Sequence, residues 1–138
     1  MSLPRMTIEP LYVVDTHALS GYLLRDKKLS VRASAIFQAA ERGETRLILP
    51  AIVLAELYFA NAKNKWFADY KTVSDTILSK PFFRFIHFHH RHVLNFDMDA
   101  AVPEMHDRII AGVARRYGVP LLTSDSLISA AAIVPIVW

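Results

Sequence analysis

The chain has 138 residues, of which 53% are hydrophobic and 21% charged, the size and balance of one globular domain. It lacks cysteine, which excludes disulfides, zinc–thiolate sites and thiol nucleophiles, and its formal charge of +3 only weakly favours a polyanionic partner. No apolar run reaches the roughly 18 to 20 residues that cross a membrane, and the first residues lack a signal-peptide pattern, so we expect a cytoplasmic protein without a membrane partner.

The first half of the chain predicts two strands, each followed by a helix. We expect residues 1–10 to be a loosely ordered N-terminal segment of the single domain 1–138, followed by a buried strand at 11–14 that ends at Asp15. Ser30 is a good N-cap for a helix over 30–42, and Gly43 is a natural stop. A second strand is predicted at 47–49, and Pro50 opens a helix that runs to about residue 63.

The second half continues this alternation. A helix is predicted over 67–78, a strand at 85–88, a helix from Pro103 to Gly118, a strand at 119–123 and a last strand at 133–137. The Pro103 helix is the clearest, because Ile110, Val113, Ala114 and Tyr117 repeat with helical spacing. Alternating strands and helices predict an α/β fold with a mainly parallel sheet flanked by helices on both faces.

Four carboxylates are predicted to meet at one edge of this sheet. Asp15 and Asp125 directly follow strands, whereas Glu56 and Asp107 lie early in helices that follow strands. Glu56 is the only charge in the apolar helical segment 51–60, and a buried carboxylate needs a cation or a route to water. Taken alone, Glu56 could reach solvent from a polar edge, and Asp107 could simply stabilise a helix N-terminus.

Carboxylates that converge repel one another unless cations neutralise them. Sites made only of oxygen ligands select hard ions such as Mg²⁺ or Mn²⁺. Such ions suit phosphodiester hydrolysis, because they can generate an attacking hydroxide and stabilise charge on the phosphate. The four carboxylates therefore point to metal-dependent hydrolysis of a phosphate ester.

In order and spacing, four segments resemble the motifs of PIN-domain ribonucleases, and of VapC-like toxins of type II toxin–antitoxin systems in particular. They are Val14-Asp15-Thr16-His17-Ala18-Leu19, Ala55-Glu56-Leu57, His106-Asp107-Arg108-Ile109-Ile110-Ala111 and Pro120-Leu121-Leu122-Thr123-Ser124-Asp125. The terminal Val137-Trp138 is similar to the ending of one VapC-like branch. The resemblance spans nearly the whole chain and implies a PIN-like three-layer sandwich.

This resemblance also implies roles for individual residues. Asp15, Glu56, Asp107 and Asp125 would be the catalytic residues and would bind the metal, one ion or two. Thr16 and Thr123 would orient the carboxylates and water through their hydroxyls. His17, where the family often has Ser or Asn, lies beside the site as a possible substrate contact. Arg108 could pair with a carboxylate of the cluster or contact substrate phosphate.

The resemblance further implies an endoribonuclease that acts on RNA in the prokaryotic cytoplasm and is restrained by a small antitoxin protein. Independently, the apolar segment 51–60 has more apolar faces than one sheet can cover, which predicts a homodimer. The histidine-rich run 87–92 is interpreted as a basic surface patch or strand end rather than a metal site.

Two other functions share part of this pattern. A phosphatase of the haloacid-dehalogenase kind also has an Asp after its first strand and binds Mg²⁺, but it needs a second Asp where this chain has His17. A PIN fold that only binds RNA or protein would be favoured by the loss of an acidic position, and all four are present.

Overall fold

The computed structural model describes residues 11–138, so the expectation for residues 1–10 lies outside the described part of the chain. Its centre is a five-stranded sheet with the order β3-β2-β1-β4-β5, in which every neighbouring pair is parallel. The strands are β1 Leu11–Val14, β2 Arg46–Pro50, β3 Phe83–Ile86, β4 Leu121–Leu122 and β5 Ile136–Val137. The predicted α/β fold with a parallel sheet is confirmed.

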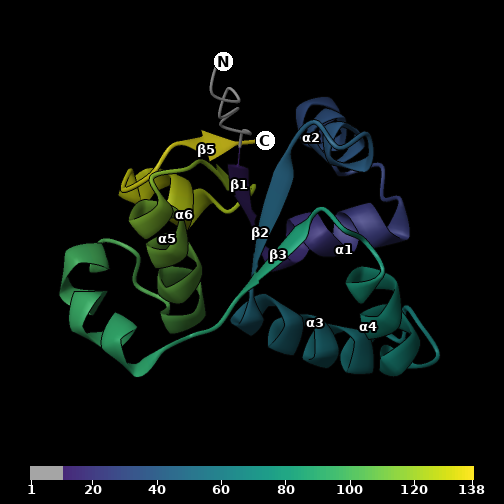
Figure 1. The fold of residues 1–138 in the computed structure, drawn as a ribbon. Coiled ribbons are helices and arrows are strands. Elements are labelled where there is room, and N and C mark those ends of the chain that lie inside the picture. Colours follow the sequence, from purple (N-terminus) through teal and green to yellow (C-terminus); the bar gives the residue numbers. More distant parts are fainter. Residues whose placement is uncertain (1–10) are drawn as a thin grey trace, which may run out of the picture.

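Helices cover both faces of this sheet and complete a three-layer arrangement (Figure 1). Their bounds are α1 Thr16–Leu24, α2 Val31–Glu41, α3 Ala51–Asn64, α4 Tyr70–Leu78, α5 Met105–Tyr117 and α6 Ser126–Ala131, with a 3₁₀ helix η1 at His90–Asp99. In Figure 1, α5, α6 and η1 lie on one side of the sheet, and α1, α2 and α4 on the other. The helix α3 leaves the end of β2 and contacts both α1 and α5.

Local signals account for most helix boundaries. The Ser30 hydroxyl accepts a hydrogen bond from the Ala33 amide and so begins α2 as predicted. Beyond the helix ends, Gly43 and Gly118 have φ angles of 77° and 64°, a left-handed conformation that glycine adopts without strain. Pro50 precedes the first residue of α3, where its missing amide hydrogen costs the helix nothing.

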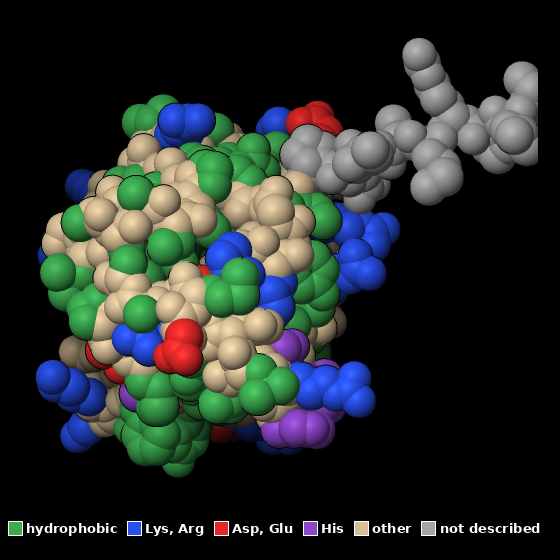
Figure 2. Space-filling view, turned by 90° about the vertical axis from the view of Figure 1, so that its left-hand side faces the viewer, with side chains coloured by type: hydrophobic (Ala, Val, Ile, Leu, Met, Phe, Trp, Pro, Cys, Tyr) green, Lys and Arg blue, Asp and Glu red, His purple; other side chains and the backbone are tan. Residues whose placement is uncertain are grey.

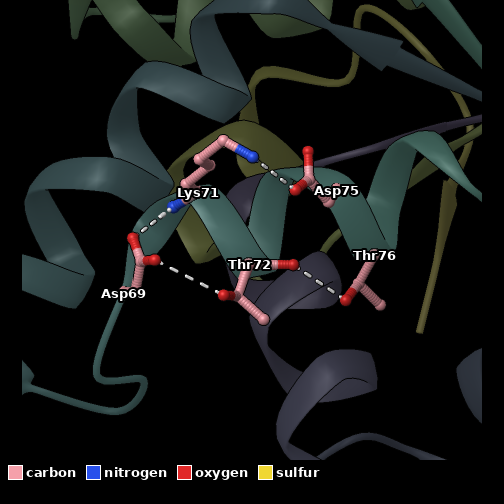
Figure 3. A network of polar contacts seen from close by, with 5 residues as sticks. All are labelled: Asp69, Lys71, Thr72, Asp75 and Thr76. Carbon is pink, nitrogen blue, oxygen red and sulfur yellow. Dashed lines mark hydrogen bonds and ion pairs between the residues drawn. The ribbon is translucent and has the colours of Figure 1, made fainter.

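The helix α4 begins three residues later than predicted. The backbone of Phe67 is held by Asn61, whose side chain accepts from the Phe67 amide at 2.8 Å and donates to the Phe67 carbonyl at 3.2 Å. The helix instead starts after Asp69, whose carboxylate accepts from the Lys71 amide at 2.9 Å (Figure 3). An ion pair one turn apart, from Lys71 to Asp75 at 3.0 Å, follows on the exposed face.

Other boundaries also differ from prediction. The third strand lies at Phe83–Ile86 instead of 85–88, α5 begins at Met105 rather than at Pro103, and the last two strands are shorter than predicted. The helices α1, η1 and α6 were not predicted at all. Each omitted α-helix begins directly after an acidic residue that caps it, Asp15 for α1 and Asp125 for α6.

The core lies between the sheet and its helices. The central strands are buried almost completely at Val13, Val14, Leu47, Ile48 and Leu49, as expected for parallel strands covered on both faces. On α5, the predicted stripe is buried at Ile110, Val113 and Ala114, whereas Tyr117 is exposed. None of the helices in residues 11–138 is long and apolar enough to cross a membrane.

Candidate active site

The structure brings all four predicted carboxylates into one cleft. Asp15 follows β1 and Asp125 follows β4, each as the N-cap of the next helix, while Glu56 lies on α3 and Asp107 in the first turn of α5. The cleft has a volume of about 340 Å³ and all four side chains line it. It opens where the carboxyl ends of the parallel strands meet the helix N-termini, the usual location of ligand sites in such sheets.

Asp15 is the most buried member and is fixed at both carboxylate oxygens. Its Oδ1 accepts from the Ala18 amide at 2.8 Å, and its Oδ2 accepts a hydrogen bond from the Thr123 hydroxyl. Burial raises the pKa of Asp15 above its ordinary value, although these two hydrogen bonds act in the opposite direction. The carboxylate is therefore held in one orientation in a poorly solvated place.

Two hydroxyls connect the carboxylates to one another. Thr123 donates to Asp15 and accepts from the Asp125 amide at 3.1 Å, so it links the ends of β1 and β4. Thr16 donates to Glu56 Oε1 at 2.8 Å across the α1–α3 contact. Both threonines thus occupy the orienting positions that the sequence resemblance implies.

The cleft carries a strong excess of negative charge. The pKa of Asp107 rises to about 6, chiefly because burial disfavours its charged form and further because Asp125, Glu104, Glu56 and Asp15 repel it. No Lys or Arg is among the described residues that line the cleft. Among the described residues that line it, only the imidazoles of His17 and His106 are basic groups.

Glu104 belongs to the same cleft, and sequence reasoning missed it. It is the N-cap of α5, accepts from the Asp107 amide at 2.7 Å and contacts His106 Nδ1 at 2.7 Å. Glu is not among the usual N-cap residues, which are Ser, Thr, Asp and Asn. The sequence holds one signal that could have identified it, because Glu104 is an acidic residue three positions before Asp107 and directly follows Pro103.

The two predicted substrate contacts occupy different positions. His17 is exposed and lines the cleft. Arg108 instead donates to the backbone carbonyls of Val102 at 2.7 Å and Ala100 at 3.4 Å, which holds the connection from η1 to α5. Within residues 11–138 these two carbonyls are the hydrogen-bond partners of Arg108, and it forms no ion pair with a carboxylate of the cluster.

The histidine-rich run lies at the start of η1. The strand β3 ends at Ile86, so His87 and His89 do not share a strand face. The Nδ1 atoms of His92 and His89 accept backbone amide hydrogens at 3.1 and 3.3 Å, so in the neutral rings the proton resides on Nε2. Figure 2 shows histidines gathered beside basic side chains on this face. The interpretation as a basic surface patch agrees with this arrangement.

The donor set of the cleft suits a hard divalent cation. Its acidic side chains supply only oxygen ligands. Burial raises the pKa values of Asp15 and Asp107, and repulsion from neighbouring carboxylates adds to both shifts. Within residues 11–138, no three acidic or histidine side chains lie close enough together to form a ready-made ion cage. Mg²⁺ commonly retains several waters and takes only one or two carboxylates directly, so an open acidic cleft fits this ion.

Fold and site together define a parallel α/β domain with an acidic cleft at the carboxyl edge of its sheet. The family model described as PIN domain matches residues 12–134, and the chain belongs to this family. The fold class and the family predicted from the sequence motifs are thereby confirmed, and the haloacid-dehalogenase alternative is wrong. The sequence matches no curated protein.

Solved structures share this fold over nearly the whole chain. VapBC2 from Rickettsia felis bound to a promoter DNA fragment is 17% identical, with 92% of this chain and 97% of that chain covered and a TM-score of 0.69. VapC20 from Mycobacterium tuberculosis, a toxin that cleaves the sarcin–ricin loop, is 16% identical, with 89% and 96% covered and a TM-score of 0.69. FitAcB from Neisseria gonorrhoeae is 20% identical, with 91% and 95% covered and a TM-score of 0.66. At these identities the likeness establishes a common fold.

Proposed function

We propose that the chain is an endoribonuclease that requires Mg²⁺ or Mn²⁺ and hydrolyses RNA phosphodiester bonds in the acidic cleft. The observation that carries this proposal is the convergence of Asp15, Glu56, Asp107 and Asp125 on one cleft without a neutralising Lys or Arg. These four carboxylates would hold the ion. A bound divalent ion lowers the pKa of water and stabilises negative charge on a phosphate undergoing attack.

The residues of the chain would prepare this site in distinct ways. Thr123 and the Ala18 amide fix Asp15, and Thr16 occupies Oε1 of Glu56, which leaves Oε2 available to the cleft. Asp125 Oδ1 accepts the Leu127 and Ile128 amides, both at 2.9 Å, so its Oδ2 is the oxygen left for a ligand. Such fixed carboxylates lose little freedom when an ion binds.

The test is cleavage of total RNA by the purified protein, with the cleavage ends mapped by sequencing. We expect defined cuts in Mg²⁺ or Mn²⁺, no cuts in chelator, and recovery when the ion is restored. Asp107→Asn keeps the shape of the side chain but removes its charge, and should lower the rate by at least about a hundredfold. A PIN fold that only binds RNA or protein would retain binding and cut nothing under any of these conditions.

We further propose that this ribonuclease is the toxin of a toxin–antitoxin pair in a prokaryotic cytoplasm. Support comes from the structures of similar fold, which include a VapBC2 complex and the toxin VapC20. A basic side chain of a small antitoxin would be attracted to the negative cleft and would compete with the metal. The test is controlled expression in a prokaryotic host.

Wild-type expression should arrest growth, and both Asp15→Ala and co-expression of a small neighbouring reading frame should relieve the arrest. The product of that reading frame should also co-purify with the chain. If the protein cleaves RNA in vitro but does not arrest growth, the toxin hypothesis would be wrong, and the protein would be a processing ribonuclease that acts without an antitoxin.

We propose that the protein forms a homodimer through the exposed face of α3. Tyr58 and Phe59 remain 50% and 71% exposed, and such apolar surface favours association. Leu57, which lies in the same apolar segment 51–60, is fully buried and belongs to the core. In sedimentation at tens of micromolar, Phe59→Glu should give monomers while Leu78→Glu, at a position on α4 that is 62% exposed, should not. A wild-type monomer would contradict the dimer.

A further inference from the structure

A second, larger hollow opens beside the acidic cleft. It has a volume of about 860 Å³ and is bordered by α1, the last turns of α3 and the start of α6. His17, Ala60 and Asp125 line both this hollow and the cleft, so the two are continuous. We refer to the larger hollow as the α1–α3 groove.

The chemistry of the groove differs from that of the cleft. Lys63 from α3 and Lys28 from the loop after α1 line the groove, whereas no Lys or Arg lines the cleft. Asp26 also lines the groove, and its carboxylate accepts the Lys28 amide at 2.9 Å. The groove therefore offers cations close to the site where a phosphodiester would be cut.

Aromatic surface accompanies these cations. The chain has two tryptophans, and both Trp66 and Trp138 line the groove. Trp66 follows the end of α3 and is 37% exposed, so part of its ring is accessible. A cation next to an exposed aromatic ring is the combination with which proteins bind single-stranded nucleic acids, through phosphate contacts and base stacking.

We propose that the α1–α3 groove binds the unpaired RNA strand on one side of the cut phosphodiester, with Lys63 contacting a phosphate and Trp66 stacking on a base. The proposal rests on the ribonuclease function and deepens it, because it names residues outside the acidic cleft that would position the RNA. Bases in a duplex are stacked on one another and cannot offer a face to Trp66. Selection of unpaired nucleotides thus follows from the groove, whereas the cleft supplies the hydrolysis.

The binding test uses a labelled unpaired RNA of about twelve nucleotides and the full-length protein in chelator, where cleavage does not interfere. Lys63→Gln should weaken binding roughly threefold to tenfold and reduce the slope of log affinity against log salt by about 1. The matched control is Lys65→Gln, which removes the same charge two residues away but does not line the groove. An effect of equal size in both variants would show a general charge effect and overturn the proposal.

Tryptophan fluorescence gives a second readout, because both tryptophans lie in the groove. Unpaired RNA should quench it, and a duplex of the same sequence should quench it much less. Trp66→Leu should weaken binding by about tenfold, and Trp66→Phe should retain part of the affinity because it keeps a ring. Unchanged affinity in Trp66→Leu would rule out the stacking role.

Two controls distinguish RNA binding in the groove from a loss of protein stability and from the ribonuclease function. Lys63 lies in the last turn of α3, where a cation stabilises the helix, so Lys63→Gln should lower the melting temperature slightly. The variant must still be fully folded at the temperature of the binding assay, and it should lose affinity there. In cleavage assays the variant should raise KM with little change in kcat. Binding that depends on Lys63 without any cleavage would refute the ribonuclease function alone, whereas cleavage without this dependence would refute the groove alone.

Discussion

Replacing Asp107 by Asn should stabilise the metal-free protein, although it removes a residue that we assign to the site. In the folded chain Asp107 is partly buried and faces Asp125, Glu104, Glu56 and Asp15, all of one sign. Asn has nearly the same shape but no charge, so the variant avoids the cost of burying a charged group and the repulsion from the other carboxylates. The unfolded chain, in which the carboxylates are solvated and far apart, gains nothing from the change.

The size of the effect follows from the pKa. A rise from 3.8 to about 6 corresponds to about 3 kcal/mol of unfavourable interaction for the charged form, at about 1.4 kcal/mol per pKa unit. Because Asp107 is only partly buried, solvent screening reduces this figure, and we expect about 1 to 2 kcal/mol in the free energy of unfolding. In a chain of this length that amounts to several degrees in the melting temperature.

Urea denaturation in chelator at pH 7.5 and at pH 4 measures the effect. Below its unfolded pKa of 3.8, the Asp107 carboxyl is protonated in both the folded and the unfolded chain and does not destabilise the protein. Above about pH 6 it is charged in both, and its full destabilising effect is present. The variant should therefore be more stable than wild type at pH 7.5, and the difference should shrink towards pH 4. The matched control Asp75→Asn removes an exposed charge on α4 and should change stability little. A less stable Asp107→Asn variant at pH 7.5 would refute the electrostatic reasoning.

Three further substitutions test other parts of the structure. Thr123→Val leaves buried Asp15 without one of its donors, and should lower stability by about 1 to 3 kcal/mol and activity at least tenfold, measured by urea denaturation and RNA cleavage. Arg115→Met leaves Asp99, which is 1% exposed, without its ion pair and should cost about 3 kcal/mol in urea denaturation, whereas near-wild-type stability would show that the pair contributes little. Gly112→Ala should lower the melting temperature despite the higher helix propensity of alanine, because the added Cβ would lie 3.0 Å from Asp99 Oδ2.

Sequence reasoning succeeded where one local signal decided the structure. The apolar run before Asp15 is a strand with the predicted bounds, and burial on both faces explains why its residues do not alternate with polar ones. Because parallel strands present their carboxyl ends at one edge, the positions of Asp15 and Asp125 could be predicted without knowing the strand order. That order, with β1 between β2 and β4, depends on packing between distant segments and could not be read from the chain.

Some of the differences from prediction depend on such distant contacts, whereas α1 and α6 begin at local caps, Asp15 and Asp125, that were interpreted only as site residues. The buried end of η1 is held by the hydrogen bonds from Arg115 to Asp99, which connect it to α5. The start of α4 was placed too early because Phe67 fits an apolar helical pattern, yet Asn61 holds its backbone in a loop. Glu104 was missed because its capping role shows only in the geometry around Asp107.

The dependence of RNA cleavage on Mn²⁺ concentration, measured for the wild type and for Asp107→Asn, tests the central claim most directly. We expect no cleavage by the wild type in chelator, a saturable rise with the ion, and a rate at least about a hundredfold lower in the variant at every concentration. The variant should remain folded, because its stability is predicted to rise in the absence of the ion. Undiminished cleavage in chelator, or full activity of a folded Asp107→Asn variant, would contradict the assignment of the acidic cleft as a metal-dependent nuclease site.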